Sequence, residues 1–355
     1  MFKILVLNPG STSTKTYIYE GSIEVQQQTL RHDVQKIGKY PTVVSQLEFR
    51  LGIIKEWLAS VGRRVKDFDA IAARGGALKP IVSGTYLVNE RIIEDLREAR
   101  YGEHASNLGA LIAKALVEGT SVPAFIVDPI VVDELQPEAR LSGHPLLPRR
   151  SIFHALNQKA VARRAAKDLG KRYQDCRLVV AHLGGGISVA AHDRGQVVDV
   201  NNALDGEGPF TPERSGTLPA GQLVELCFSG KYSRDEVMRM VKGKGGLAAY
   251  LGTTDVREVE KRIAEGDPEA EAVFRAMAYQ ISKEIGAQSA VLEGKVDAIV
   301  LTGGIAYSER LVKLVSDRVK AFAPVLVYPG EDEGRALAEG VLRVLEGEER
   351  ALEYI

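Results

Sequence analysis

The sequence predicts an α/β protein of two domains, on three observations. Its 355 residues exceed what one hydrophobic core usually supports. Short apolar, β-branched runs alternate with segments of helical periodicity, which is typical of sheets covered by helices. A strand–turn–strand pattern near the N-terminus recurs in the second half of the chain. We expect one domain over residues 1–148 and a second over 149–333, with a C-terminal helix at 334–355 packed back on the first.

The chain opens with a strand, a turn and a second strand. FKILVLN is a short apolar run, and KTYIYEG alternates polar and apolar residues up to Gly21. Residues 43–62 space their apolar side chains by three and four, which predicts an amphipathic helix. Later segments alternate in the same way: strand and turn at 68–76, helix, loop and strand at 106–128, helix at 154–173, strand–loop–strand at 176–200, helix at 275–294, strand at 297–304, helix at 308–323, strand at 324–330, and a final helix from Gly334.

The composition excludes several classes of protein. The 46 basic and 47 acidic residues give a net charge of −1, so nothing favours nucleic acid or an anionic membrane as a partner. Two cysteines, Cys176 and Cys227, form no CxxC pair and fit a reducing compartment. No segment approaches the ~20 apolar residues of a membrane span, and the N-terminal apolar run is too short for a signal peptide. We expect a cytoplasmic protein.

Two strand–turn–strand segments align without a gap. When Asn8 is placed on His182, Gly21 falls on Gly195 at a constant offset of 174. NPGSTSTKTYIYEG then lies over HLGGGISVAAHDRG with low identity, so two unrelated hairpins would also explain the pattern. A true repeat predicts a duplicated domain with one phosphate-binding hairpin in each half, facing each other across a cleft, and a crossing between the halves near 143–150.

The first turn, NPGSTSTK, has the composition of a phosphate site. Gly10 allows the backbone to approach an anion. The groups that can donate to phosphate are the loop N–H groups, the hydroxyls of Ser11, Thr12 and Ser13, and Lys15. The Walker A motif is excluded, because the spacing differs and a strand follows where that motif needs a helix. A polar β-turn uses the same residue types, so both interpretations stay open.

Two further glycine turns follow strands. The first combines a strand-terminal histidine with three glycines, whose lack of side chains favours a close backbone approach. The second precedes a helix, which suits a nucleoside or a phosphate. A buried, hydrogen-bonded histidine and an ordinary structural turn are the alternatives. The residues are His182, Gly184, Gly185 and Gly186 in the first turn, and Gly303, Gly304 and Ile305 in the second.

Two arginines next to glycines complete the pattern. Arg74 in AARGG and Arg214 in TPERSG carry guanidinium groups that suit carboxylates and phosphates, although a single arginine is more often a surface residue. Asp128 and Glu333 are candidates for a magnesium shell, since Mg²⁺ takes one or two carboxylates together with phosphate oxygens. The glycine turns, arginines and internal repeat together indicate ATP-dependent phosphoryl transfer.

Together these segments resemble the acetate kinase family of the actin, sugar kinase and heat-shock ATPase superfamily, and within it the butyrate kinases. The motifs that carry the resemblance are NPGSTSTK and HLGGGISVAAH for the phosphates, LTGGIAYSE for adenosine, and ARGG, YGEHASN, DGEGPFTPERSG and SIFHALNQKAVAR between them. The resemblance spans nearly the whole chain. It implies two duplicated actin-like (ribonuclease H-like) domains with an interdomain cleft, the cofactors ATP/ADP and Mg²⁺, and a homodimer or larger homo-oligomer.

The resemblance also implies the roles of individual residues. Asn8, Ser11 and Lys15 match the loop near the transferred phosphoryl group. Arg74 and Arg214 match the arginines that hold the carboxylate and stabilise the transition state, and His182 matches a histidine that contacts the γ-phosphate. His104 matches a second active-site histidine, although Ala-Ser-Asn follows it where acetate kinases have Asn-Pro. Asp128 matches an active-site aspartate, and Glu333, together with Asn8, matches the metal site, with Glu331 and Asp332 as neighbouring alternatives.

The implied reaction is transfer of the γ-phosphoryl group of MgATP to a carboxylate, giving an acyl phosphate and ADP. A carboxylate is ionised at pH 7, so no general base is required. Ala181 and Gly76 stand where acetate kinases have bulkier residues, so we expect a wider pocket and a C4 acid, straight or branched, in preference to acetate. An acetate or propionate kinase is the nearest alternative, a non-catalytic actin-like ATPase is a second, and a sugar kinase, which would need a catalytic aspartate, is less favoured.

Overall fold

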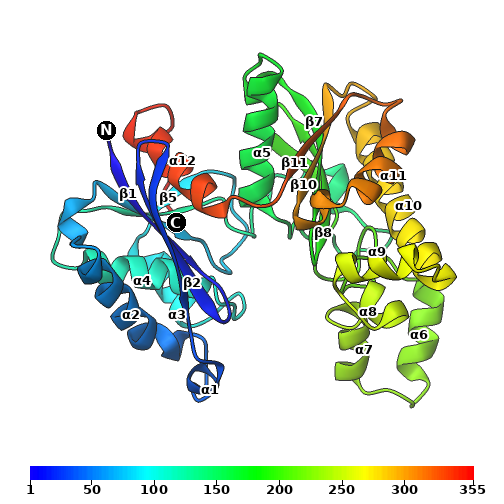
Figure 1. The fold of residues 1–355 in the computed structure, drawn as a ribbon, viewed down its shortest axis with the longest axis horizontal. Helices are drawn as coiled ribbons and strands as arrows, with labels where there is room; N and C mark the ends of the chain where they lie inside the picture. Colours follow the sequence, from blue (N-terminus) through cyan, green and yellow to red (C-terminus); the bar gives the residue numbers. More distant parts are fainter. The chain divides into compact units, whose positions relative to one another are not determined.

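The computed structural model describes residues 1–355 and divides into two compact units. Unit 1 comprises Met1–Val132 and Asp332–Ile355, and unit 2 comprises Asp133–Glu331. Each unit contains one β-sheet with helices on both faces, as the sequence predicts (Figure 1). None of the helices combines the length and the apolar character that a membrane crossing requires.

The first unit ends earlier along the chain than the predicted boundary at residue 148. Residues that follow Val132 are bonded into unit 2: the Gln136 N–H donates to the Val198 carbonyl at 2.9 Å. The buried Lys159 ammonium also contacts Glu134 Oε2 at 2.6 Å. These bonds explain why the boundary lies near Asp133.

Unit 1 is built on a six-stranded sheet of order β3-β2-β1-β4-β6-β5. Strand β1 pairs antiparallel with β2 and parallel with β4. Leu5, Leu7 and Ile71 face the core under α2 and α4, whereas α12 packs on the other face of β1, β4 and β6. The elements are β1 (Lys3–Pro9), β2 (Ser13–Glu20), β3 (Ile23–Arg31), α1 (Val34–Ile37), η1 (Val44–Gln46), α2 (Leu47–Ser60), η2 (Val65–Asp67), β4 (Ala70–Arg74), β5 (Thr85–Leu87), α3 (Glu90–Arg97), α4 (Asn107–Val117), β6 (Ala124–Val127) and α12 (Glu333–Leu345).

Unit 2 is built on a five-stranded sheet of order β11-β10-β7-β8-β9. On β7, Val179 and Leu183 face the core formed with α10 and α11, and Leu178 and Val180 face α5 on the other side (Figure 1). The elements are η3 (Glu138–Arg140), α5 (Ala155–Asp168), η4 (Tyr173–Asp175), β7 (Arg177–Leu183), β8 (Ile187–Asp193), β9 (Gln196–Val200), α6 (Ala220–Phe228), α7 (Arg234–Val241), α8 (Gly246–Leu251), α9 (Val256–Ala264), α10 (Pro268–Val291), β10 (Ala298–Gly303), η5 (Gly304–Tyr307), α11 (Glu309–Val319) and β11 (Val325–Pro329).

The two units repeat one topology, which confirms the predicted duplication. In each, a central strand forms an antiparallel hairpin on one side and a parallel pair on the other: β1 lies between β2 and β4, and β7 lies between β8 and β10. The central strands, Lys3–Pro9 and Arg177–Leu183, are related by the offset of 174 at both ends (177 minus 3 and 183 minus 9). The likeness therefore lies in strand order and direction as well as in residue pattern.

The gapless alignment is wrong beyond the turn. Asn8 pairs with Lys15 across the first hairpin, whereas His182 pairs with Ser188 across the second. The second turn is therefore one residue shorter, and the offset after it is 173 (188 minus 15). Three glycines allow this tighter turn, because Gly184–Gly186 has no Cβ atom that the backbone must avoid.

The buried pair of Lys159 and Glu134 gives the first testable prediction. The Lys159 ammonium also donates to the Gly195 carbonyl at 2.8 Å, and its side chain is 0% exposed. Lys159→Met removes the cation from a buried carboxylate, so we expect unit 2 to lose about 3–5 kcal/mol of stability. Thermal denaturation of Lys159→Met and of the double variant with Glu134→Gln checks this. The double variant should be more stable than Lys159→Met alone. If the two variants lost the same stability, the charges of Lys159 and Glu134 would not be coupled.

Candidate functional site

The β1–β2 turn presents the predicted phosphate residues of unit 1. Asn8 and Lys15 are paired across the hairpin, so their side chains leave the sheet on the same face. The Gly10–Ser13 turn is closed by a backbone hydrogen bond of 2.8 Å, and Ser11 and Thr12 are exposed at its tip. The closed turn therefore carries hydroxyl groups at its tip, and the amide of Asn8 and the ammonium group of Lys15 lie at its base.

Arg74, Asn8 and Glu333 form one polar cluster in unit 1. The Arg74 guanidinium contacts both carboxylate oxygens of Glu333, Oε2 at 3.2 Å and Oε1 at 3.0 Å. The Asn8 amide donates to Glu333 Oε2 at 2.7 Å, and its oxygen accepts from Arg74 at 3.3 Å. Arg74 is therefore paired with a carboxylate of its own unit through a two-pronged contact, a type of contact that guanidinium groups favour.

Three consecutive carboxylates precede or begin α12, and the structure separates their roles. Glu331 Oε1 lies 3.1 Å from His182 Nε2 in unit 2. Asp332 caps α12, because its side chain accepts from the Arg335 N–H at 3.0 Å. Glu333 alone joins the cluster of Arg74 and Asn8.

His104 and Asp128 lie in unit 1 with their own partners. His104 Nδ1 is 2.7 Å from the Ser106 hydroxyl, and burial, with a smaller effect of the Arg74 charge, lowers the pKa of its imidazole. Asp128 is buried at a backbone φ of 38°, and its Oδ1 accepts from the Ser83 hydroxyl at 2.6 Å and the Gly84 N–H at 2.8 Å. His104 thus belongs to the surroundings of Arg74, and Asp128 fixes the start of β5.

The β7–β8 turn of unit 2 is packed against Arg214. A Cβ atom on Gly186 would lie 1.9 Å from an Arg214 guanidinium nitrogen, so only glycine allows this approach. The Thr211 hydroxyl holds the Gly185 carbonyl at 2.5 Å. Burial lowers the pKa of Arg214, although nearby carboxylates oppose the shift. The predicted glycine turn and the predicted arginine therefore form a single structural group.

His182, at the end of β7, is 1% exposed and held from two sides. Its Nδ1 accepts a hydrogen bond of 2.8 Å from the Asn157 amide, so the neutral ring carries its proton on Nε2, the atom that faces Glu331. The ring of His154 stacks on it at a centroid distance of 3.8 Å. Sequence reasoning missed Asn157 and His154, because both lie at the start of an ordinary amphipathic helix, α5.

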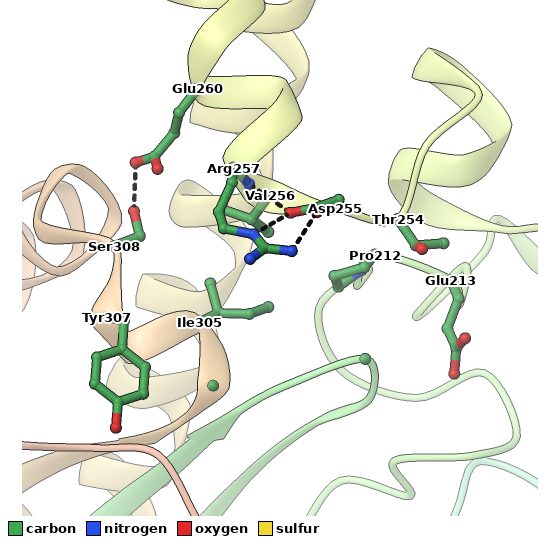
Figure 2. A pocket seen from close by; sticks show the side chains of 12 residues that line it. Pro212, Glu213, Thr254, Asp255, Val256, Arg257, Glu260, Ile305, Tyr307 and Ser308 are labelled. Carbon is green, nitrogen blue, oxygen red and sulfur yellow. Dashed lines mark hydrogen bonds and ion pairs between the residues drawn. The ribbon is translucent and has the colours of Figure 1, made fainter. Parts of the chain in front are cut away.

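A pocket of about 770 Å³ lies in unit 2, in the size range of small-molecule sites. The predicted phosphate turn and the predicted adenosine turn both reach it, through Gly185 and through Gly304 and Ile305. Figure 2 shows the remaining walls, which come from the loop between β9 and α6, from the segment between α8 and α9 with the start of α9, and from η5 with the residue after it. The lining residues are Gly185, Pro212, Glu213, Thr254, Asp255, Val256, Arg257, Glu260, Gly304, Ile305, Tyr307 and Ser308.

The α9 wall of this pocket was not predicted from the sequence. Asp255 caps α9 and binds Arg257 through both carboxylate oxygens, at 2.9 and 2.6 Å (Figure 2). These contacts hold the pKa of Asp255 down at about 2. The Ser308 hydroxyl donates to Glu260 at 2.6 Å and so ties α9 to the segment after β10. Aspartate is one of the common residues at a helix N-cap, so its position gave no sequence signal for a binding role.

The two residues expected to widen the acyl pocket do not do so. Ala181 is fully buried in the core under α10, on the face of β7 opposite to His182. A Cβ atom on Gly76 would lie 2.5 Å from Asn107 Oδ1 and 2.8 Å from Leu96, so this glycine lets α4 approach and opens no space. The argument for C4 acids from these positions was wrong, because it ignored the alternation of side chains along a strand and the helix that covers Gly76.

Fold and site together define an α/β protein of two repeated actin-like units, with a nucleotide-sized pocket in the second. Residues 142–325 match the model of the acetokinase family. The chain belongs to this family. Membership makes it a phosphotransferase that acts on a carboxyl group, with ATP or ADP as its nucleotide.

Solved structures of known kinases share the fold. The acetate kinase of Porphyromonas gingivalis is similar with a TM-score of 0.79 at 21% identity, over 97% of this chain and 100% of that one. A propionate kinase of Francisella tularensis has a TM-score of 0.74 at 19% identity, over 96% and 99%. The acetate kinase of Entamoeba histolytica has a TM-score of 0.74 at 17% identity, over 95% and 98%.

The position of Ala181 gives a second testable prediction. Ala181→Phe inserts a benzyl group into a filled core, so we expect a loss of about 1–3 kcal/mol of stability. The ratio of kcat/KM values for butyrate and acetate should stay unchanged in the folded fraction. Thermal denaturation and steady-state kinetics of the variant check both points. A shift toward acetate at unchanged Tm would restore the discarded pocket argument.

Proposed function

We propose that the protein reversibly transfers the γ-phosphoryl group of ATP to a short-chain carboxylic acid, with butyrate or a branched C4 acid as the acceptor. One observation supports the proposal above all: two glycine turns far apart in sequence line one pocket of nucleotide size. Gly185 belongs to the turn predicted for phosphate, and Gly304 and Ile305 belong to the turn predicted for adenosine. A pocket lined by a turn suited to phosphate and by a turn suited to adenosine fits a nucleoside polyphosphate.

The nucleoside would lie against the apolar side of this pocket. Val256 and Ile305 are buried apolar residues there, and Tyr307 adds a ring with 70% of its surface exposed. Such surfaces take a flat purine base, while the glycine turn leaves the backbone open to phosphate oxygens. Gly304 has open space where a Cβ atom would stand, so this wall is kept clear by the absence of a side chain.

The proposed step needs no base. The ionised acid attacks the γ-phosphorus through one carboxylate oxygen, the bond from that phosphorus to the β–γ bridging oxygen breaks, and the electron pair leaves with ADP. No proton is transferred. The reaction depends on holding both anions and on stabilising the charge on the transferred group.

Donor groups suited to these tasks are present in each unit. In unit 1, Arg74 holds a carboxylate by a two-pronged contact, so we assign it the acid substrate. In unit 2, Arg214 against Gly186 and the protonated Nε2 of His182 are donors that we assign to phosphate oxygens. The reaction class thus matches a site rich in cationic and N–H donors.

Asn8 and Glu333 fit a magnesium ion. They are joined by a 2.7 Å hydrogen bond and offer amide and carboxylate oxygens, the ligand types that Mg²⁺ prefers. The bound ion would neutralise charge on the phosphate oxygens. Asp332 is engaged as the cap of α12 and Glu333 with Asn8 and Arg74, so the choice of Glu333 as the ligand rests on the resemblance. The predicted cytoplasmic location and homo-oligomeric state stay predictions.

The chain length of the acid rests on the motifs ARGG, YGEHASN and SIFHALNQKAVAR, whose sequences resemble butyrate kinases. Acetate and propionate are the alternatives, because the similar structures are described as acetate and propionate kinases. An actin-like ATPase without kinase activity is the third candidate. It would hydrolyse ATP whether or not an acid is present.

A panel of acids tests the proposed function. ADP release and acyl phosphate formation, trapped with hydroxylamine, are measured with acetate, propionate, butyrate and isobutyrate, and without acid. We expect both products only with acid, and kcat/KM for a C4 acid at least about 10-fold above that for acetate. Preference for acetate would contradict the C4 assignment alone. ADP release that no acid changes would contradict the kinase.

The nucleotide pocket is tested by filling it. Gly304→Leu places a side chain in the open space, so we expect KM for ATP to rise about 10-fold or more while KM for the acid changes little. Gly221→Leu is the matched control, because a Cβ there also meets open space, on the exposed helix α6 outside the pocket. Equal kinetic effects of the two variants would speak against the pocket as the nucleotide site.

A further inference from the structure

Arg50 is a fully buried cation in unit 1 that neither the proposed function nor the sequence motifs include. It lies on α2 and is 1% exposed, which makes it the largest fully buried side chain of the protein. A buried charge is costly unless the protein satisfies it. The groups that bind Arg50 therefore indicate why the protein buries this charge.

All five hydrogen-bond acceptors of Arg50 are neutral, and four of them belong to the segment NPGSTST, residues 8–14. Its guanidinium donates to the Gly10 carbonyl at 2.7 Å and to the Ser11 carbonyl at 2.9 Å. A longer contact of 3.4 Å reaches the Ser13 carbonyl. The Gln46 side-chain oxygen accepts from the other edge at 3.1 and 2.8 Å.

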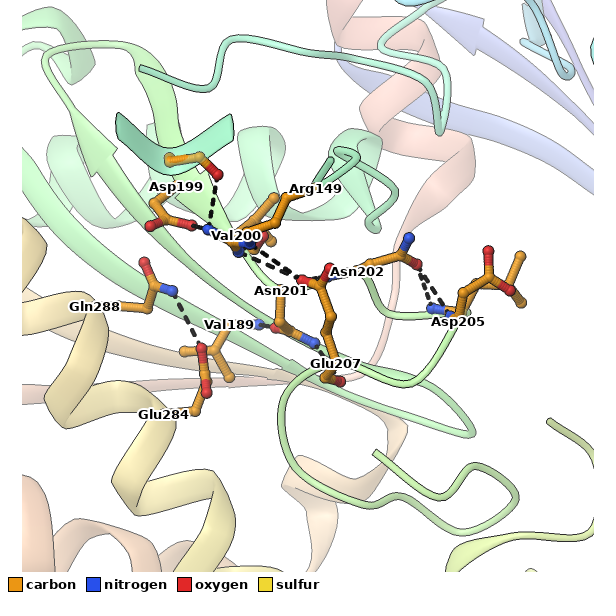
Figure 3. Close-up of polar contacts among 12 residues, drawn as sticks. Arg149, Val189, Asp199, Val200, Asn201, Asn202, Asp205, Glu207, Glu284 and Gln288 are labelled. Carbon is orange, nitrogen blue, oxygen red and sulfur yellow. Dashed lines mark hydrogen bonds and ion pairs between the residues drawn. The ribbon is translucent and has the colours of Figure 1, made fainter. Parts of the chain in front are cut away.

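Arg149, which is only partly buried, provides a contrast. Arg149 also binds backbone carbonyls, but Asp199 at 3.0 Å and Glu207 at 3.4 Å balance its charge (Figure 3). Arg50 has no carboxylate partner, and burial alone lowers its pKa, to about 10, which leaves the group charged at neutral pH. Unit 1 thus keeps an unbalanced positive charge behind the phosphate turn.

Because the peptide unit is planar, the contacts of Arg50 with two carbonyls also fix the directions of the N–H groups in the same peptide units. In a trans peptide the C=O and N–H groups point in opposite directions. Since Arg50 holds the Gly10 and Ser11 carbonyls, the N–H groups of Ser11 and Thr12 point away from α2. Neither N–H donates to a protein group, and both residues are exposed.

The remaining side of the turn is held in the same way. The Thr12 carbonyl accepts from the His32 N–H at 2.9 Å, and the His32 ring contacts the Thr14 hydroxyl at 2.9 Å. Burial and, to a smaller extent, Arg50 lower the pKa of His32 to about 4, so this neighbour adds no charge at neutral pH. Successive carbonyls therefore face inward, and successive N–H groups face outward as in an anion-binding nest.

We propose that Arg50 is the positioning residue of the phosphate turn: it turns the amides of Ser11 and Thr12 toward the phosphoryl group and supplies the positive charge behind them. The proposal rests on the proposed function for the identity of the anion. A guanidinium is needed because two carbonyls must be held by one rigid fork, which an ammonium group cannot span.

Arg50→Lys tests the proposal in the full-length protein by kinetics. Lysine keeps the charge and loses the fork, so we expect kcat to fall about 10- to 100-fold while KM for ATP stays within about threefold. Arg262→Lys is the matched control, since Arg262 holds the Leu251 carbonyl and Asp267 outside the pocket. It should leave kcat unchanged. A loss of Tm without any loss of kcat in Arg50→Lys would overturn the proposal.

A binding measurement separates this inference from the proposed function. The amide ¹H–¹⁵N signals of Ser11 and Thr12 are followed during titration with inorganic phosphate. We expect both signals to shift in the wild type and to shift much less in Arg50→Lys. This result does not depend on kinase activity, so it would hold even if no acid caused ADP release. If Arg50→Lys fails to fold, Gln46→Met, which frees one edge of the guanidinium, should show a smaller effect of the same sign. No shift in the wild type, or equal shifts in wild type and variant, would overturn the proposal.

Discussion

Parallel pairing of β7 with β10 is the constraint on which the pocket of unit 2 depends. Carboxyl ends of parallel strands lie at the same edge of a sheet, and here His182 is in register with Thr302. The turns that follow must therefore meet, although more than a hundred residues separate them. Gly303 makes the meeting sterically possible: its φ is 90°, and a Cβ atom there would lie 2.4 Å from the Leu183 carbonyl oxygen. Only glycine satisfies both conditions.

The same constraint organises unit 1, with different side chains. Leu7 is in parallel register with Ala73, so the next residues, Asn8 and Arg74, lie side by side near the carboxyl ends of adjacent strands and are hydrogen-bonded. Glu333 reaches them because the chain returns to unit 1 as α12, which packs on β1 and β4. Duplication thus supplied one strand arrangement twice, and each copy placed different polar groups at the same edge: an amide and an arginine in one, a histidine and a threonine in the other.

The sequence could predict the features that neighbouring residues determine, but not those that depend on contacts between distant segments. Strands β1 and β7 and their glycine turns were predictable, because an apolar run followed by small residues determines both. The face on which Ala181 lies was also predictable: it precedes His182 on a strand, so the two side chains must point to opposite faces. The surroundings of Gly76 were not, since α4 comes some thirty residues later and only tertiary packing brings Asn107 onto it. Arg50 and the α9 wall were missed for the same reason, because an arginine in an amphipathic helix and an aspartate cap look like surface residues until their partners are known.

The engagement of the acids in unit 1 argues for an ionised acceptor. A kinase that phosphorylates a hydroxyl group needs a carboxylate placed to take a proton. Asp128 instead accepts hydrogen bonds from Ser83 and Gly84, and Glu333 accepts from Asn8 and Arg74. Both carboxylates therefore accept hydrogen bonds from fixed donors of their own unit. Around the turn the excess lies with donors: the exposed amides, the hydroxyls of Ser11 and Thr12, and the buried charge of Arg50. Such an arrangement can bind and orient anions, which is what phosphoryl transfer to a carboxylate requires.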